Sequence, residues 1–177
     1  MHWKILALGG TLAAAVLLTG LWPLHSKSTQ PPQTEKSSNL ARGSETSSGW
    51  ITDFKKAEDE AKANHKLVFV NFTGSDWCGY CIQLDRAIFS QPQFKDYAKK
   101  NLVLLEIDFP SQRGTRWKAQ PLDLKRQNME LAQRFEVEAF PTLVVLDGQG
   151  KTLWRYEGYY MGGLNAFLAE LDKVRKG

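Results

Sequence analysis

Two cysteines, Cys78 and Cys81, stand in the stretch GSDWCGYCIQ and are the only cysteines of this chain. Two sulfurs at this spacing can hold part of a metal site, close a small disulfide, or exchange electrons with other thiols. The preceding stretch, KLVFVNFT, has the nearly continuous apolar character of a buried strand. The stretch CIQLDRAIF has a helical pattern instead. The pair is therefore expected at a strand-to-helix turn.

A helix that begins at Cys78 would direct its first free N–H groups at that sulfur. These donors and the helix dipole stabilise a thiolate, so we expect Cys78 to be nucleophilic near neutral pH. Cys81 would lie one turn further along on the same face, where it can attack a mixed disulfide formed by Cys78. The pattern favours redox exchange, with Gly79 and Tyr80 as the short bridge between the sulfurs.

Two alternatives are weaker. A structural zinc ion needs four ligands, and besides the cysteines the chain offers three histidines, His2, His25 and His65. Two of these histidines lie in or beside an N-terminal apolar segment, so we expect no metal site. A purely structural disulfide is the other alternative, but a loop this small constrains the unfolded chain little.

The N-terminal residues predict export from the cytoplasm. Lys4 precedes an apolar run from Ile5 to Leu24, a pattern typical of a signal peptide or an N-terminal membrane anchor over residues 1–25. Residues 26–49 contain seven serines and no aromatic residue, and they predict a flexible linker. Either form of the leader places the rest of the chain in the periplasm or on the outer face of the cytoplasmic membrane.

Residues 50–177 are expected to form one folded domain. The net charge of +4 comes without a long run of Lys or Arg, so we expect no nucleic-acid partner. Early alternation of strand and helix predicts a parallel pair and a late hairpin predicts an antiparallel edge, which gives an α/β mixed sheet with helices on both faces. Helices are expected at 52–64, at 81–89, from Ser90 onward, at 122–135 and at 164–176. Strands are expected at 66–73, 102–108, 142–147 and 151–157.

Two local patterns outside the cysteine stretch also carry expectations. Ser90 and Gln93 have the spacing of a capping box, and Phe89 and Phe94 have that of the flanking hydrophobic staple. Residues 109–121, which hold one tryptophan among basic residues, are expected to form a solvated surface loop. Partner binding is the alternative for that loop.

The stretches VNFTGSDWCGYC and FEVEAFPTLVVLDGQGK together resemble the thioredoxin superfamily, over roughly residues 50–175. The shorter FTGSDWCGYC is similar to exported, thioredoxin-like bacterial proteins. The resemblance implies a thioredoxin-like three-layer fold, with a central mixed β-sheet flanked by helices. It also implies a cis-proline that faces the cysteines and lets a substrate peptide pair there as an added strand. The candidate site residues are catalytic Cys78 and Cys81, and substrate-binding Trp77, Gly79, Tyr80, Phe140 and Pro141.

One departure from the family concerns proton transfer. Thioredoxins carry a buried Asp on the strand before the cysteines, thought to move the proton of the second cysteine. The matching residue here is Asn71, which cannot titrate. Asp76 is expected to be exposed at its turn, with a catalytic role as the alternative. Glu106 and Asp108 end a strand and could approach the site, but a solvated strand end is favoured. The group that handles the proton of Cys81 therefore stays open.

These observations predict a thiol–disulfide oxidoreductase that acts outside the cytoplasm through Cys78 and Cys81. No bound cofactor is needed, because electrons travel through the sulfurs. Expected partners are protein thiols or disulfides and, for a reductant, an electron donor in the membrane. We expect a monomer, tethered through residues 5–24 if the leader is not cleaved. The alternatives are a non-catalytic peptide-binding module and a thiol-based metal chaperone, and the direction of electron flow is not assigned.

Overall fold

The computed structural model describes residues 49–177. The expected leader (1–25) and, apart from Gly49, the expected linker (26–49) lie outside the described residues. Within the described part, no helix is both long and apolar enough to cross a membrane. The helices are α1 (Phe54–Asn64), α2 (Gly79–Leu84), the π-helical turn η1 (Asp85–Phe89), α3 (Pro92–Asn101), α4 (Thr115–Ala119), α5 (Leu122–Arg134) and α6 (Gly163–Lys176), and the strands are β1 (Leu67–Thr73), β2 (Leu102–Asp108), β3 (Thr142–Leu146) and β4 (Thr152–Glu157).

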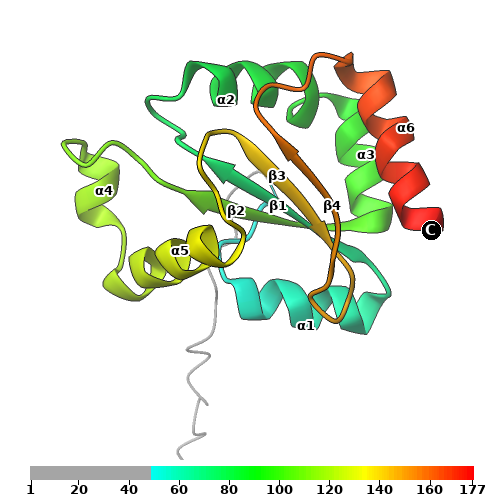
Figure 1. The fold of residues 1–177 in the computed structure, drawn as a ribbon, viewed down its shortest axis with the longest axis horizontal. Helices are drawn as coiled ribbons and strands as arrows, with labels where there is room; N and C mark the ends of the chain where they lie inside the picture. Colours follow the sequence, from blue (N-terminus) through cyan, green and yellow to red (C-terminus); the bar gives the residue numbers. More distant parts are fainter. Residues whose placement is uncertain (1–48) are drawn as a thin grey trace, which may run out of the picture. The chain divides into compact units, whose positions relative to one another are not determined.

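The four strands form one mixed sheet in the order β2-β1-β3-β4 (Figure 1). Strands β1 and β2 are parallel, as expected for a pair joined through helices. Strand β3 runs antiparallel to β1, and β4 continues from β3 as a hairpin. The α/β mixed sheet predicted from the sequence is confirmed.

Apolar side chains alternate between the two faces of the sheet and pack under different helices. Val68, Val70 and Phe72 of β1 belong to the core beneath α1 and α5. Phe69, which lies between them in sequence, belongs to the core beneath α2, α3 and α6. Because successive side chains of a strand point to opposite faces, Asn71 lies on the same face as Phe69. The result is three layers, with the cysteine-bearing helix on the second face.

The chain enters the domain along the outer edge of the sheet. The backbone N–H of Ile51 donates to Leu104 at 2.9 Å, and the carbonyl of Ile51 accepts from Glu106 at 2.9 Å. Ile51 thereby forms a parallel bridge with Leu105. Helix α1 follows after Asp53, whose carboxylate accepts the N–H of Lys56 at 2.8 Å and caps the helix.

The predicted capping box at Ser90 is wrong. Ser90 ends η1, and its hydroxyl donates to the carboxylate of Asp85 at 2.9 Å instead of capping the next helix. Helix α3 begins without a side-chain cap, with a proline in its first turn as expected. The apolar half of the motif is present, because the rings of Phe89 and Phe94 lie 5.1 Å apart. Because η1 ends at Ser90, this serine does not lie at the N-cap of α3, the position that its spacing predicts.

The predicted loop at residues 109–121 is also partly wrong, because it contains the short helix α4. This helix lies between β2 and α5 in the chain, and it stands out from the sheet beside α5 (Figure 1). The ammonium of Lys125 lies 4.7 Å from the ring centre of Trp117 and joins α5 to α4 through a cation–π contact. The segment is therefore an ordered insertion and not an unstructured loop.

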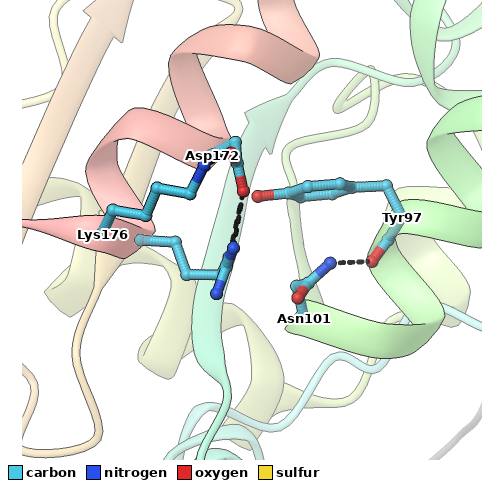
Figure 2. Close-up of polar contacts among 5 residues, drawn as sticks. Tyr97, Asn101, Asp172 and Lys176 are labelled. Carbon is cyan, nitrogen blue, oxygen red and sulfur yellow. Dashed lines mark hydrogen bonds and ion pairs between the residues drawn. The ribbon is translucent and has the colours of Figure 1, made fainter.

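Helix α6 packs beside α3 on the second face of the sheet, and a polar cluster lies between the two helices (Figure 2). Asp172 accepts from Arg175 at 2.7 Å and from Lys176 at 2.5 Å, in the basic last turn that the sequence predicts. The ring of Tyr97 from α3 faces this group, and burial is the main cause that raises the pKa of its hydroxyl. Exposed ion pairs of this kind contribute little to stability, so the apolar contacts of Phe167 and Leu171 hold the helix.

Candidate active site

The two cysteines form a disulfide at the start of α2, with their Cα atoms 5.2 Å apart. Cys78 is the N-cap residue of that helix, and its sulfur accepts the backbone N–H of Cys81 at 3.2 Å. The expected helix start at Cys78 is confirmed. A donor aimed at the sulfur favours the negative charge that this atom carries when the disulfide is reduced. Both residues are buried, with 6% and 5% of their surface exposed.

A cis peptide bond joins Phe140 to Pro141, as the family resemblance implies. The ring of Phe140 meets the ring of Trp77 edge to face, with 5.8 Å between centroids. Trp77 is the residue before Cys78. This contact therefore places the loop that contains Pro141 (the proline loop) beside the loop between β1 and α2 that leads to Cys78 (the cysteine loop). Pro141 is buried and leads directly into β3. Its carbonyl accepts from Gly158 at 2.8 Å.

The other expected substrate contacts lie on the exposed side of the pair. Trp77 has 53% of its surface exposed and Tyr80 has 65%, although both are large aromatic residues. The ring of Tyr80 lies 6.2 Å from that of Tyr159, which follows β4. Gly79 has open space around its Cα. The structure therefore brings Trp77 and Phe140 into contact, whereas Tyr80 packs toward a different segment.

The cysteine loop is fastened to the insertion after β2 by polar contacts that the sequence did not indicate. Asp76 is exposed, as expected, and its carboxylate accepts the N–H of Ser111 at 2.8 Å. The hydroxyl of Ser75 donates to Asp108 at 2.7 Å and accepts from Arg116 at 2.6 Å. Because these partners lie about 35 to 40 residues apart in the chain, no local spacing pattern could have found them. The loop that presents Cys78 is thus held from one side by β2 and α4.

An apolar pocket of about 440 Å³ lies between this insertion and the proline loop. Trp77 and Phe140 form one wall, and the ring of Phe109 packs 5.4 Å from Phe140. Trp117 of α4 and the exposed Met129 of α5 also line it. Among these residues, Phe109 and Met129 were missed by the sequence analysis. Their only signal was apolar character, with Phe109 just after a predicted strand and Met129 inside a predicted helix.

The expectation of a solvated strand end is wrong for Glu106 and Asp108. Glu106 is only partly exposed, and burial, aided by the negative charge of Asp108, raises its pKa to about 7. The carboxylate of Asp108 accepts hydrogen bonds from both the N–H and the hydroxyl of Ser75, so it helps to hold the cysteine loop in place. Glu106 pairs in register with Asn71 on the neighbouring strand. Asn71 is buried, and its side-chain oxygen has no hydrogen-bond partner among the described residues.

Comparison with known proteins agrees with this geometry. A family model described as a thioredoxin-like domain matches residues 54–175. The chain belongs to the thioredoxin-like family. It is 34% identical over 123 residues to the disulfide bond reductase DsbH of Chlamydia pneumoniae, a match that covers 70% of each protein.

Solved structures of thioredoxin-like proteins give the same result. The structure of a DsbH oxidoreductase superposes with a TM-score of 0.64 at 29% identity, covering 83% of this chain and 95% of that one. A thioredoxin from Thermus thermophilus, at 23% identity and a TM-score of 0.51 over 70% of this chain and 84% of its own, shares the fold. This thioredoxin-like chain is a thiol–disulfide oxidoreductase with a CxxC pair at disulfide distance.

Proposed function

We propose that this thioredoxin-like protein reduces disulfides of protein substrates outside the cytoplasm, with Cys78 as the attacking thiol and Cys81 as the resolving thiol. The position of Cys78 at the N-cap of α2, where its sulfur accepts the N–H of Cys81, carries the proposal. The relative of 34% identity is named a disulfide bond reductase, which supports the reducing direction. The apolar N-terminal run supports export, because a positive end followed by such a run is the export pattern.

The proposed reaction consists of two exchanges between sulfurs. The thiolate of Cys78 attacks one sulfur of the substrate disulfide, forms a mixed disulfide, and releases the other substrate sulfur as a thiolate. Cys81 then loses its proton and attacks the sulfur of Cys78. The second substrate sulfur leaves, and the Cys78–Cys81 disulfide of the structure forms. Two electrons pass to the substrate, so no cofactor is needed.

Substrate docking is assigned to the surface around the cis-proline. An extended polypeptide would pair with the backbone beside Phe140 and Pro141, in the manner of an added strand. The exposed ring of Trp77, the open backbone at Gly79 and the ring of Tyr80 would flank it. The apolar pocket next to Trp77 offers space for a bulky side chain of the substrate.

A reductant needs a source of electrons after each cycle. We assign this task to a dithiol electron donor in the membrane, with the protein acting as a monomer tethered through residues 5–24 or released after cleavage. If residues 26–49 form the expected flexible linker, these 24 residues would reach roughly 25 to 30 Å and would keep the domain near the membrane surface. Fractionation of cells that express the full chain, followed by N-terminal sequencing, distinguishes the anchored from the cleaved form.

An insulin disulfide-reduction assay tests the proposed roles. We expect the reduced wild-type protein to reduce insulin, Cys78→Ser to be inactive, and Cys81→Ser to accumulate a mixed disulfide with the substrate. Equal activity of the wild-type protein and Cys78→Ser would remove the proposed roles. The redox potential then tests the direction. A reductant is expected to lie nearer to the value of thioredoxin, about −270 mV, than to that of a strong oxidant, about −120 mV.

A further inference from the structure

The resolving step requires a proton acceptor near Cys81. The side chain of Cys81 is 95% shielded from solvent, and burial disfavours the charged form of a thiol. Attack on the mixed disulfide needs the thiolate, so the proton must move to a nearby group. Asn71, on the strand before the cysteines, has an amide that cannot accept it.

Strand alternation places Glu106 on the face of the sheet that α2 covers. Leu102 and Leu104 of β2 pack in the core beneath α2, α3 and α6, whereas Val103 and Leu105 pack in the other core. Since side chains two residues apart share a face, Glu106 continues the row of Leu102 and Leu104. In the parallel register it stands beside Asn71. Two polar groups thus lie side by side in the layer below the cysteine-bearing helix.

The charges around Glu106 connect it to the cysteine segment. Asp108, two residues further on the same face, is bonded to Ser75 of the cysteine loop. Asp85 interacts electrostatically with Glu106, and it stands four residues after Cys81 on the continuous helical segment α2–η1. Residues four apart lie on the same side of a helix, so Cys81 shares the side of the segment from which Asp85 acts on Glu106. Arg116 of α4 supplies the opposite charge.

We propose that Glu106 accepts the proton of Cys81 when Cys81 resolves the mixed disulfide. The proton leaves the sulfur of Cys81 and enters the carboxylate of Glu106, which stands in register beside Asn71. The side-chain oxygen of Asn71 has no partner among the described residues. The thiolate then bonds to the sulfur of Cys78. The bond between Cys78 and the substrate sulfur breaks, and the substrate leaves with the electron pair. The assignment rests on the proposed roles of the two cysteines.

The acidity of Glu106 suits this task. In the disulfide form its pKa is raised to about 7, chiefly by burial and next by Asp108, while Arg116 acts in the opposite direction and Asp85 adds a further increase. A proton acceptor works best when its pKa lies near the working pH, because it is then partly ionised and still basic. An ordinary exposed carboxylate would be a much weaker base.

Two-phase kinetics with an aromatic disulfide reagent separate the two sulfur exchanges. Reduced protein mixed with 5,5′-dithiobis(2-nitrobenzoate) releases one coloured thiolate when Cys78 attacks, and a second when Cys81 resolves the mixed disulfide. We expect Glu106→Gln to leave the first phase unchanged and to slow the second at pH 7 by about a hundredfold, the lower end of the usual range for such proton transfer. The wild-type second phase should rise with pH through a midpoint near 7, and the variant should lose this midpoint.

Matched variants control for structural effects. Glu130→Gln removes an exposed carboxylate from α5 and should leave both phases and the midpoint unchanged. Adding Asn71→Asp to Glu106→Gln places a carboxyl on the neighbouring strand and should restore much of the second phase. If Glu106→Gln does not fold, Glu106→Asp retracts the carboxyl by one methylene and should slow the second phase while keeping a pH midpoint.

The outcomes separate this proposal from the proposed function. A second phase with the same rate and the same midpoint in Glu106→Gln, or in Glu106→Asp if only that variant folds, overturns the role of Glu106 and leaves the roles of the cysteines intact. A wild-type protein that shows no first phase overturns both. For Glu106→Gln, a slowed second phase whose pH midpoint is unaltered also overturns it, because that result indicates a change of geometry alone.

Discussion

The indole N–H of Trp77 donates to the carbonyl of Phe109 at 2.7 Å, which joins the residue before Cys78 to the residue after β2. The rings of Trp77 and Phe109 both pack on Phe140, the residue before the cis-proline. Three segments far apart in the chain therefore meet in one aromatic wall beside the disulfide. The position of Trp77 therefore depends on its hydrogen bond to Phe109 and on its ring contact with Phe140.

Gly74→Ala should displace this tryptophan. A Cβ atom at position 74 would lie 2.5 Å from the indole of Trp77, closer than any real contact, so the ring must move and lose its bond to Phe109. We expect a loss of about 1–3 kcal/mol in the free energy of unfolding, as for other overpacked sites. Urea unfolding followed by tryptophan fluorescence measures it, and the folded variant should show a shifted emission maximum.

Gly79→Ala is the matched control for that experiment. A Cβ atom at position 79 meets no atom within 4 Å, and the residue opens α2. Because alanine favours a helix over glycine by up to about 1 kcal/mol, stability should be equal or slightly higher. Equal losses in both variants would show that the contact with Trp77 is not the cause.

Trp117→Ala should change the choice of substrate and not the sulfur chemistry. Trp117 lines the pocket and is not one of the residues beside the cysteines in the chain, so its removal widens the place assigned to a bulky substrate side chain. We expect kcat/KM for disulfide peptides with Phe or Leu near the cysteine to fall about tenfold, the usual value for a poorly filled apolar site. Peptides with Gly at those positions and oxidised glutathione should react at unchanged rates. A uniform decrease for all substrates would contradict a pocket for side chains.

We expect the oxidised protein to lose stability as pH rises toward neutrality, because the Glu106 carboxyl then ionises. Its pKa is raised from the ordinary 4.5 to about 7, so the folded form keeps a proton that the unfolded chain releases between these values. The stabilising contribution is full below about pH 4.5 and is lost on passing through the folded pKa. The loss amounts to about 3 kcal/mol by linkage.

Glu106→Gln should remove that part of the pH dependence. Urea unfolding of the oxidised wild-type and variant proteins between pH 4.5 and 8 gives the difference in stability directly. As pH rises, the free energy of unfolding of the variant should increase relative to that of the wild-type protein. Parallel curves would show that the carboxyl is not held in a proton-retaining environment.

Asp53→Ala should destabilise the domain by about 1 kcal/mol, because Asp53 is the N-cap of α1 and accepts the N–H of Lys56. Thermal unfolding should show a lower Tm by a few degrees. Asp59→Ala, which removes the exposed partner of Lys55 on the same helix, should cost less than about 0.5 kcal/mol. Equal losses would argue against the cap as the cause.

The fold and the redox pair were predictable because their signals are local. Continuous apolar runs predicted the buried strands β1 and β2, and the order of elements predicted the mixed sheet. The start of a helix at Cys78 followed from a strand pattern that ends just before it. The cis bond at Pro141 came from the family resemblance, since a proline alone does not indicate the isomer.

The remaining features depend on contacts that a linear pattern does not contain. Ser90 has the correct spacing for a cap, but the π-helical turn before it redirects its hydroxyl to Asp85. The sequence around Glu106 is typical of a polar strand end, yet the residue is only partly exposed and burial raises its pKa. The pocket next to Trp77 needs α4 and α5 to pack beside the proline loop. In each case tertiary packing decides what the side chain meets.

The bridge at Ile51 restricts where this sheet can accept another strand. Ile51 already occupies the N–H of Glu106 and the carbonyl of Leu104 on the outer edge of β2, groups that would otherwise invite pairing with a second copy. At the opposite edge, Arg155 and Glu157 of β4 place charges along the strand. Protection of both borders discourages self-association, and it leaves the backbone beside the cis-proline as the place where we propose that a substrate chain pairs.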